Sequence, residues 1–531
     1  MLLLCLLPAR PAAAGRLSAG LEELLAGSAA DSRIGVIVRF ADPGGGMAKE
    51  LAALEWLPRR EKRGRLAKRA AERVELSTLR LRPILERHRA TGRIEDVKPL
   101  RLANALAIKG SPEAIRELAA DATVQSVSED RVVRLVASRP SPASSPGWNL
   151  TRIGAPQLWA RGLVGQGVVV ANLDTGVDGT HPALQAKWRG GSNSWFDPHR
   201  GTPLPYDPDG HGTAVMGVMV AGDVNLNPVG VAPGALWIAA KIFDDSGFAT
   251  MSSIHRAFDW VLDPDGDPAS DDAADVVNNS WDLENPGGVD LEFAADIDAL
   301  RSAAIGVVFA AGNGLNGQGL PVPPATNTSM SPANNPGALS VGATDINDQV
   351  ADFSSRGPSA LDGSIYPILT APGVHVTSTL PHGAYATYTN LGTSFAAPHV
   401  SGAMALLMGG GTKSLAAIEA ALKSSAADID LPGADNSSGY GRLDVAAAAQ
   451  ALGSTPPLLP GGDVDGSGAV DLGDLLLLLR VAAGRQPATP AILASGDMAP
   501  LGPAGLPSPD GKITAADVLI MLRRYLGIIS W

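Results

Sequence analysis

The sequence predicts an α/β protein as its main domain, with a mostly parallel sheet in a three-layer arrangement. Residues 167–173 form a valine-rich apolar run, which is typical of a strand buried on both faces of a parallel sheet. Asp174 follows at the carboxyl end of this run, where open α/β sheets build their sites. His211 and Ser394 each precede a stretch of small and apolar residues that predicts a helix.

The two predicted helix starts have a chemical meaning. Glycines on both sides of His211 allow a tight turn into a helix that begins near Thr213, so the imidazole lies at the helix N-terminus. Ser394 precedes the small-residue run 395–407 in the same way. A helix start presents backbone N–H groups and the positive end of the helix dipole to developing negative charge.

The candidate catalytic residues occur in the order Asp174, His211, Ser394, inside DTG, HGT and GTS motifs. Chymotrypsin-like chains have the order His, Asp, Ser, and α/β-hydrolases have the order Ser, acid, His. Together with the stretches PDGHGTAVMG, VVNNSW and VVFAAGNG, this order resembles the subtilase family, in particular its bacillopeptidase F branch. The resemblance covers roughly residues 147–452 and implies a subtilisin-like fold.

Acyl transfer assigns a role to each residue. A serine hydroxyl is a poor nucleophile at neutral pH, so His211 takes the proton of Ser394 as general base and later returns it to the leaving amine. Asp174 fixes the tautomer of the imidazole and stabilises the imidazolium. The resemblance implies that Asn313 of AAGNG forms the oxyanion hole with the backbone N–H of Ser394, and that Ser280 of NNSW begins the segment that binds substrate.

The sequence departs from the family pattern in two places. Ala214 stands where the usual motif continues Gly-Thr-His, and DLENPGG follows Trp281 where relatives usually carry glycines. Asp282 and Glu284 add negative charge beside the predicted substrate segment. This charge predicts a preference for basic side chains in the substrate.

The favoured interpretation is a secreted serine endopeptidase that hydrolyses peptide bonds through an acyl-enzyme and is made as an autoprocessed zymogen. The alternative is a catalytically silent binding or surface-display protein on the same scaffold, although the presence of the three catalytic residues and Asn313 argues against it. A lipase or esterase is disfavoured because no G-x-S-x-G elbow surrounds Ser394.

Composition and the start of the chain agree with export. The formal net charge of −12 argues against nucleic acid as a partner. Residues 1–14 are apolar and end in three alanines, so we expect a signal peptide, although the usual basic start is missing and the true start codon stays open. Cys5 is the single cysteine, so the mature chain has no disulfide or thiol nucleophile. These features predict a secreted protein, extracellular or associated with the cell surface.

Residues 33–135 differ in character from the peptidase domain predicted at 148–452. They begin with a strand-like segment and continue through a basic helical stretch at 47–90, which is otherwise explained as a solvated charged helix. The region resembles the inhibitor-type propeptide of subtilases, a small α+β domain that acts as an intramolecular inhibitor and assists folding. A Pro- and Ser-rich linker at 136–147 joins the two regions.

After a Pro/Gly-rich linker at 453–462, residues 463–531 contain two stretches with the oxygen spacing of calcium loops, the second of them irregular. Each precedes an apolar helix too short to span a bilayer, so no transmembrane segment is predicted. The pair resembles an all-α dockerin type I module, which implies a cohesin-like partner; the alternative is a calcium-stabilised cap. The predicted calcium ligands are Asp463, Asp465, Ser467, Asp471 and Asp474 in the first loop, and Asp497, Asp510 and Asp517 in the second.

Overall fold

The computed structural model divides into two compact units. The first contains the chain up to Arg134 together with Phe248–Ala273 and Ala295–Ala303, and the second contains the remaining residues. The predicted signal peptide 1–14 lies outside the described residues, as does most of the predicted linker 136–147. The described residues are 16–42, 54, 57–135, 140–142, 147–222, 229–314, 326–388, 392–411, 413–453, 461–465, 470–501, 505, 507 and 509–529.

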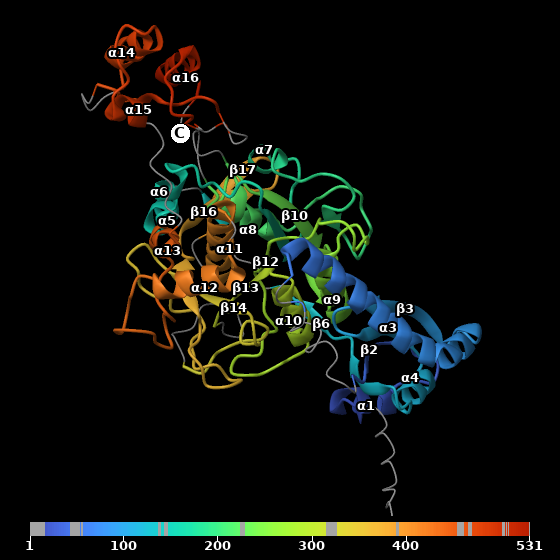
Figure 1. The fold of residues 1–531 in the computed structure, drawn as a ribbon. Coiled ribbons are helices and arrows are strands. Elements are labelled where there is room, and N and C mark those ends of the chain that lie inside the picture. The colour runs from blue at the N-terminus through green and yellow to red at the C-terminus, as the bar shows by residue number, and fades with distance from the viewer. Residues whose placement is uncertain are drawn as a thin grey trace, which may run out of the picture. The chain divides into compact units, whose positions relative to one another are not determined.

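The second unit is organised around a seven-stranded sheet in which all neighbouring strands run parallel (Figure 1). The central strands consist mainly of buried Val, Ala and Leu residues, as expected for a sheet covered on both faces. The predicted α/β class is therefore confirmed. In spatial order the strands are β15 (Leu369–Pro372), β14 (Leu339–Thr344), β13 (Gly306–Ala310), β12 (Val276–Asn279), β8 (Val169–Asp174), β10 (Leu236–Lys241) and β9 (Trp195–Phe196).

Helix α11 (Thr393–Gly409) packs on β12 to β15 and on α8 (His211–Val220). All residues from Thr393 to Leu407 are buried, which explains why this helix is apolar on every side. The start of α8 lies two residues before the predicted one, because Gly210 makes the turn with a φ of 95°. The other elements of this unit are α5 (Trp148–Arg152), α6 (Ala155–Trp159), α7 (Pro182–Gln185), α12 (Leu415–Ser424), α13 (Val445–Ala451) and the three-stranded sheet of β7 (Pro140–Pro142), β16 (Val376–Leu380) and β17 (Ala384–Tyr388).

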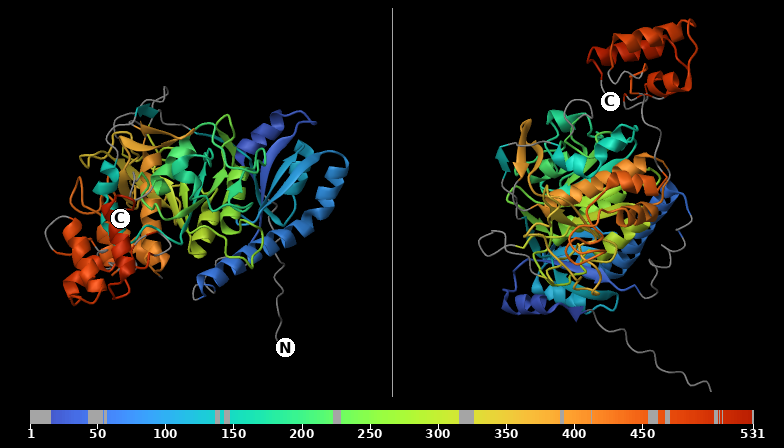
Figure 2. Two further views of the ribbon diagram at one scale, coloured as in Figure 1. Left: turned by 90° about the horizontal axis from the view of Figure 1, so that it is seen from above. Right: turned by 90° about the vertical axis from the view of Figure 1, so that its left-hand side faces the viewer.

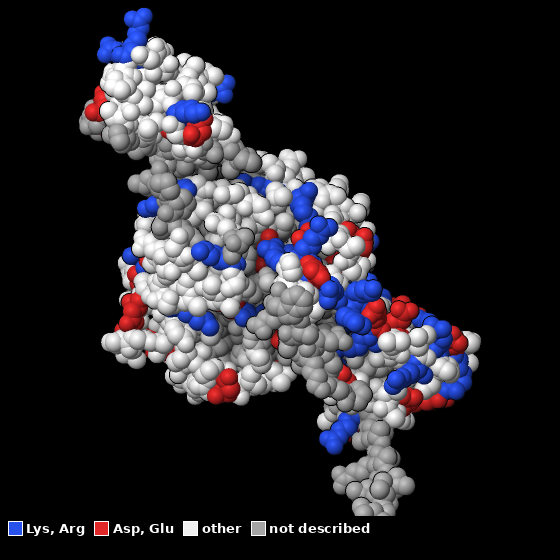
Figure 3. Space-filling model, in the orientation of Figure 1, with Lys and Arg blue, Asp and Glu red and all other residues white. Residues whose placement is uncertain are grey.

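The first unit contains a five-stranded sheet and the long helix α3 (Arg59–Ala90), which forms much of the predicted basic helical stretch (Figure 2). Lys, Arg, Asp and Glu side chains alternate over the surface that carries α3 (Figure 3). Residues 16–32 add a strand and a helix to this fold, so it begins before the predicted boundary at 33. Its strands are β1 (Arg16–Leu17), β5 (Val124–Glu129), β2 (Ile34–Phe40), β4 (Ala105–Gly110) and β3 (Ile94–Leu100), and its helices also include α1 (Ala19–Gly27) and α4 (Pro112–Ala119).

The same unit includes two segments that lie inside the predicted peptidase region in sequence. Strand β6 (Val132–Arg134) pairs antiparallel with β11 (Phe248–Thr250), and β11 leads directly into α9 (Met251–Leu262). Most of α10 (Ala294–Ser302) also belongs to this unit. Strand β3 of the five-stranded sheet is also in contact with α9, which lies much later in the chain.

The C-terminal residues form a small helical module with its own core. Helices α14 (Leu472–Ala482) and α16 (Ala515–Tyr525) pack together, and α15 (Pro490–Gly496) lies between them in sequence. Leu478 and Met521, one from each packed helix, are fully buried in this core. Among the described helices of the whole chain, none has both the length and the apolar composition needed to cross a membrane.

Candidate active site

Two of the predicted catalytic side chains form a buried pair. Asp174 ends β8 and His211 begins α8, and Asp174 Oδ1 lies 2.8 Å from His211 Nδ1. Their exposed fractions are 1% and 4%. The backbone N–H of Thr175 also donates to Asp174 Oδ1 at 2.7 Å. Because a carboxylate only accepts, His211 carries its proton on Nδ1 and leaves Nε2 available as a base.

Burial and neighbouring charges shift the pKa values of both His211 and Asp174. Burial alone would lower the pKa of His211, but the negative charges of Asp174, Asp209 and Asp207 outweigh burial and raise it above the usual histidine range. Burial raises the pKa of Asp174, and the hydrogen bond and charge of His211 oppose that increase. The three aspartates therefore stabilise an imidazolium at this position.

The start of α8 is held by a residue that the sequence interpretation did not single out. Asp207 Oδ1 accepts the N–H of Gly210 at 2.9 Å, and Asp207 Oδ2 accepts both the N–H and the hydroxyl of Thr213 at 2.8 and 2.7 Å. Gly212 is required here because a Cβ would lie 2.1 Å from the carbonyl oxygen of Gly176. An aspartate just before a glycine-flanked helix start is the capping signal that could have identified Asp207.

Ser394 lies in the first turn of α11 and is 6% exposed. Its Oγ donates to the backbone oxygen of Ser280 at 3.2 Å, and Ser280 Oγ donates to the backbone oxygen of Ser394 at 2.8 Å. The structure thus brings together two residues that are 114 positions apart. The ring of His211 lies near that of Phe395, the residue after Ser394, with a centroid distance of 6.1 Å, and His211 Nε2 has no hydrogen-bond partner among the described residues.

Asn313, the predicted oxyanion residue, follows β13 and faces the same helix start. Its Oδ1 accepts the N–H of Thr393 at 3.2 Å and the hydroxyl of Thr393 at 2.8 Å. With Oδ1 occupied in this way, the amide NH2 is the part of Asn313 that can donate to another group. The structure therefore places an amide beside the N-terminus of α11, next to Ser394.

Two other histidines have structural roles. His399 is fully buried in α11, where Nδ1 donates to the carbonyl oxygen of Phe395 and Nε2 accepts from Asn149, each at 2.7 Å. Burial lowers the pKa of His399 to about 4, so this ring is neutral. His181 caps α7 by accepting the N–H of Ala183.

The first predicted calcium loop is partly assembled. Oxygen atoms of Asp463, Asp465 and Asp474 lie within 4.8 Å of one another, which fits the oxygen ligands that calcium prefers. Asp474 accepts three backbone N–H groups, which lower its pKa against the opposing effect of burial. Asp471 caps α14. Ser467 lies outside the described residues.

The second predicted loop repeats part of this pattern. Asp517 accepts the N–H groups of Met498, Ala499 and Thr514, just as Asp474 accepts three N–H groups in the first loop. Asp497 accepts the N–H groups of Asp510 and Gly511. Among the described residues, these carboxylates are not brought together in the way that the three of the first loop are.

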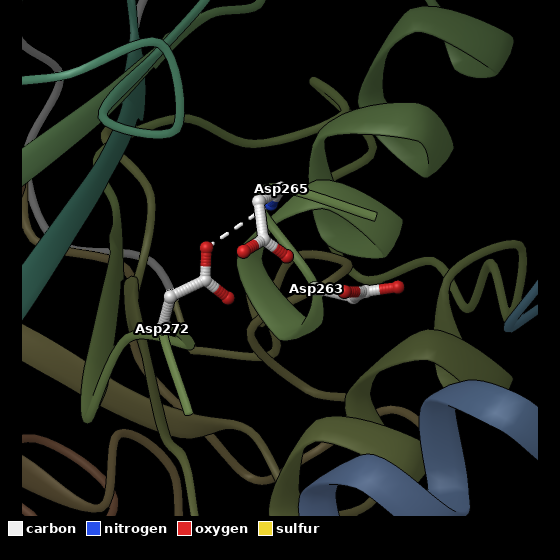
Figure 4. A group of neighbouring side chains, drawn as sticks. All are labelled: Asp263, Asp265 and Asp272. Carbon is white, nitrogen blue, oxygen red and sulfur yellow. Dashed lines mark hydrogen bonds between the residues drawn. The ribbon is translucent and has the colours of Figure 1, made fainter. Parts of the chain in front are cut away.

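A further acidic group was not predicted. Asp263, Asp265 and Asp272 follow α9 and also have oxygen atoms within 4.8 Å of one another (Figure 4). The N–H of Asp265 donates to Asp272, and Arg101 pairs with Asp263 at 3.4 Å. The cation next to this group in the structure is thus an arginine from residues 16–134.

A parallel α/β sheet with a buried Asp–His pair beside a serine at a helix start defines the class of serine-type endopeptidases. Comparison with known proteins identifies the family. Residues 165–441, more than half of the chain, match the Subtilase family, and this chain belongs to that family.

Individual relatives agree with this assignment. The chain is 43% identical to Bacillopeptidase F of Bacillus subtilis (strain 168) over 274 residues, which are 49% of this chain and 18% of the relative. It is 35% identical to Subtilisin E of the same organism over 312 residues, 59% of this chain and 72% of the relative. It is 37% identical to M-protease of Shouchella clausii (strain KSM-K16) over 303 residues, 57% of this chain and 68% of the relative. The match therefore covers less than a fifth of Bacillopeptidase F.

Proposed function

We propose that this protein is a secreted subtilisin-like serine endopeptidase that uses Asp174, His211 and Ser394 as its catalytic residues and is made as an autoprocessed zymogen. The observation that carries the proposal is the buried hydrogen bond between Asp174 and His211, with Nε2 of the imidazole unpartnered among the described residues and Ser394 in the first turn of α11, which packs on the helix of His211. The family and its named relatives support the same activity.

In the proposed reaction, His211 Nε2 takes the proton of Ser394 Oγ as that oxygen attacks the carbonyl carbon of the scissile peptide bond. The negative charge that forms on the carbonyl oxygen is stabilised by the NH2 of Asn313 and the N–H of Ser394. His211 then protonates the leaving amine, the C–N bond breaks, and an ester remains on Ser394. Water, deprotonated by His211, hydrolyses that ester and restores the free serine.

Ser394 Oγ must first leave the carbonyl oxygen of Ser280, to which it donates in the structure. A rotation about one side-chain bond redirects a serine hydroxyl, and staggered rotamers of this bond interconvert readily. We therefore assign the hydrogen bond to Ser280 to the resting enzyme and a bond to His211 to the reacting complex.

Contacts within the first unit support the proposal that residues 33–135 act as an inhibitor-type propeptide. Asp259 of α9 accepts the N–H groups of Arg101 and Leu102, each at 2.8 Å. Asp130 accepts the N–H and hydroxyl of Ser252 at the start of the same helix. Both contacts join residues before the linker to a segment inside the region that matches the family.

Calcium is proposed as a structural ion of the C-terminal module. Asp463, Asp465 and Asp474 would hold it in the first loop, and Asp471 with Ser467 completes the predicted set. Asp497, Asp510 and Asp517 form the corresponding proposal for the second loop. A bound ion would offset the mutual repulsion of the carboxylates and so stabilise the packing of α14 on α16. A cohesin-like partner stays a proposal that rests on the resemblance of the sequence to dockerins.

The test uses a fluorophosphonate probe, which reacts with an activated serine. Secreted, purified wild-type protein and the variant Ser394→Ala are treated with the probe, and loss of residues before about Gly147 is followed by intact mass. We expect labelling and processing in the wild type alone. A folded, processed wild-type protein that fails to react would favour the alternative, a silent scaffold for binding.

A further inference from the structure

We propose that Asp282 is a specificity-determining residue, which selects a lysine or arginine side chain on the substrate residue whose carbonyl is attacked. This inference rests on the proposed endopeptidase activity and names its substrate class.

After β12, one side chain contacts the candidate active site and the next packs in the core. Ser280 Oγ reaches the backbone of Ser394 in the site. The next side chain, Trp281, is 4% exposed and packs against the rings of Phe293 and Phe309, with centroid distances of 5.7 and 5.4 Å. Successive side chains of an extended segment point to opposite sides, and we infer that the same alternation continues past the end of β12 and returns Asp282 to the side of Ser280.

Three hydrogen bonds connect the segment after Asp282 and the segment before Asn313 to the segment around Met330 and Ser331. The N–H of Leu283 donates to the carbonyl oxygen of Ser331 at 2.9 Å. The buried hydroxyl of Tyr366 donates to the carbonyl oxygen of Ala311 and accepts the N–H of Met330. Asp282 therefore lies near the segment that supplies the oxyanion amide.

Gly312, the residue before Asn313, packs closely against Met330. A Cβ at Gly312 would lie 2.6 Å from Met330 Sδ, so this position has no room for a side chain and the two segments are in direct contact. Asp282 itself is half-buried, and at a partly buried site a charge interacts more strongly with an opposite charge than it does in bulk water.

The carboxylate of Asp282 lacks a countercharge in the described structure. Its Oδ1 accepts the N–H of Glu284 at 2.8 Å, and no Lys, Arg or His of the described residues pairs with it. Burial, with a smaller contribution from the charge of Glu284, raises the pKa of Asp282 to about 6. The side chain is half-buried, so solvent reaches it. Above its pKa this carboxylate is an anion that a substrate cation would stabilise.

The spacing fits a long side chain. Two residues of extended chain span at most about 7 Å, so Asp282 lies roughly that far along the chain from Ser280, whose backbone oxygen contacts Ser394 Oγ. A lysine or arginine on the residue that supplies the attacked carbonyl carries its charge at the end of a long flexible stem. A short or acidic side chain would leave Asp282 unpaired or repelled.

The experiment compares Asp282→Asn with wild-type enzyme on two peptides that differ only in that residue, lysine in one and glutamine in the other. Asparagine keeps the oxygen that accepts from Glu284 but removes the charge. We expect the wild type to prefer the lysine peptide in kcat/KM, and we expect Asp282→Asn to reduce the lysine-to-glutamine ratio by at least about 10-fold. The matched control is Asp362→Asn, because Asp362 accepts the N–H two residues ahead in the same way but is exposed.

The lysine-to-glutamine ratio of kcat/KM should also depend on pH. Asp282 is ionised above its raised pKa, so the preference for lysine is present at neutral pH and is lost as pH falls through about 6. The groups that face it are Glu284, whose negative charge acts in the same sense, and Tyr366, whose pKa is raised by burial so that it stays neutral. Taking the ratio of two substrates at each pH cancels the titration of His211, which affects both.

The possible outcomes separate this inference from the proposed function. A wild-type enzyme that reacts with the fluorophosphonate and cleaves both peptides at equal rates overturns the role of Asp282 and leaves the endopeptidase intact. A preference for lysine that survives in Asp282→Asn overturns it as well. Absence of both labelling and cleavage in the folded, processed wild type instead removes the endopeptidase activity on which the inference rests.

Discussion

Ser394 Oγ donates to the backbone oxygen of Ser280 at 3.2 Å. In the structure the proposed nucleophile is thus held by the start of the proposed substrate segment. A substrate that binds along this segment competes for the same backbone groups, and this competition would release the hydroxyl toward His211. In the proposed mechanism, substrate binding would thus be coupled to activation of the serine.

The pH dependence of the reaction should follow the charge around His211. Nearby aspartates raise the pKa of the imidazole, and the general base must be neutral, so kcat/KM rises as pH increases through that raised value. Replacing Asp209 with asparagine removes one of these charges and should move the rise to lower pH. The check is a pH profile with a neutral peptide. Asp430→Asn, at an exposed position, serves as the control, and an unchanged profile in Asp209→Asn would contradict this electrostatic account.

Replacing Asn313 with alanine should lower kcat with little effect on KM, because its amide acts on charge that develops only in the transition state. The corresponding loss in subtilisin, about 10²–10³-fold or roughly 2.7–4 kcal/mol, is the range we expect. Steady-state kinetics with a soluble peptide measure it. The labelling of Ser394 and circular dichroism show whether the variant is folded. A KM effect with kcat preserved would assign Asn313 to substrate binding instead.

Association of residues 33–135 with the peptidase region should depend on Asp259. This half-buried carboxylate accepts two backbone N–H groups, and hydrogen bonds to a charged group contribute about 1.5–3 kcal/mol each. In the Ser394→Ala background, the linker is cut with an added protease and the two parts are separated by size-exclusion chromatography. Asp259→Ala should dissociate at least about 10-fold more readily than the parent. Asp298→Asn, an exposed change on α10, should behave like the parent, and equal dissociation of all three proteins would exclude this contact as a main contributor.

Calcium binding should depend on Asp474. This buried carboxylate lies with Asp463 and Asp465 and orders the loop through three backbone N–H groups. Calorimetric titration of full-length Ser394→Ala protein with calcium should show binding that Asp474→Asn weakens by at least about 10-fold. Asp430→Asn is again the matched surface change. No heat of binding in the parent would remove the calcium proposal for this module.

The sequence offers candidate site residues because each lies at a point where the chain must change direction. Asp174 ends an apolar strand, His211 begins a helix, and Ser394 lies in the first turn of another, the last two next to glycines. These signals are local, so they can be identified from a few neighbouring residues. The α/β class follows from the same kind of signal, since a strand buried on both faces is apolar throughout.

Tertiary structure alone decided the contacts between distant parts of the chain. The sequence gives no sign that Ser394 rests on the oxygen of Ser280 or that Arg101 lies beside Asp263. The pKa shifts of His211 and Asp282 belong here too, because they depend on burial and on charges brought near by folding. A sequence determines which groups are present and where the backbone turns. Distances, desolvation and the choice of partner arise only when packing brings remote segments together.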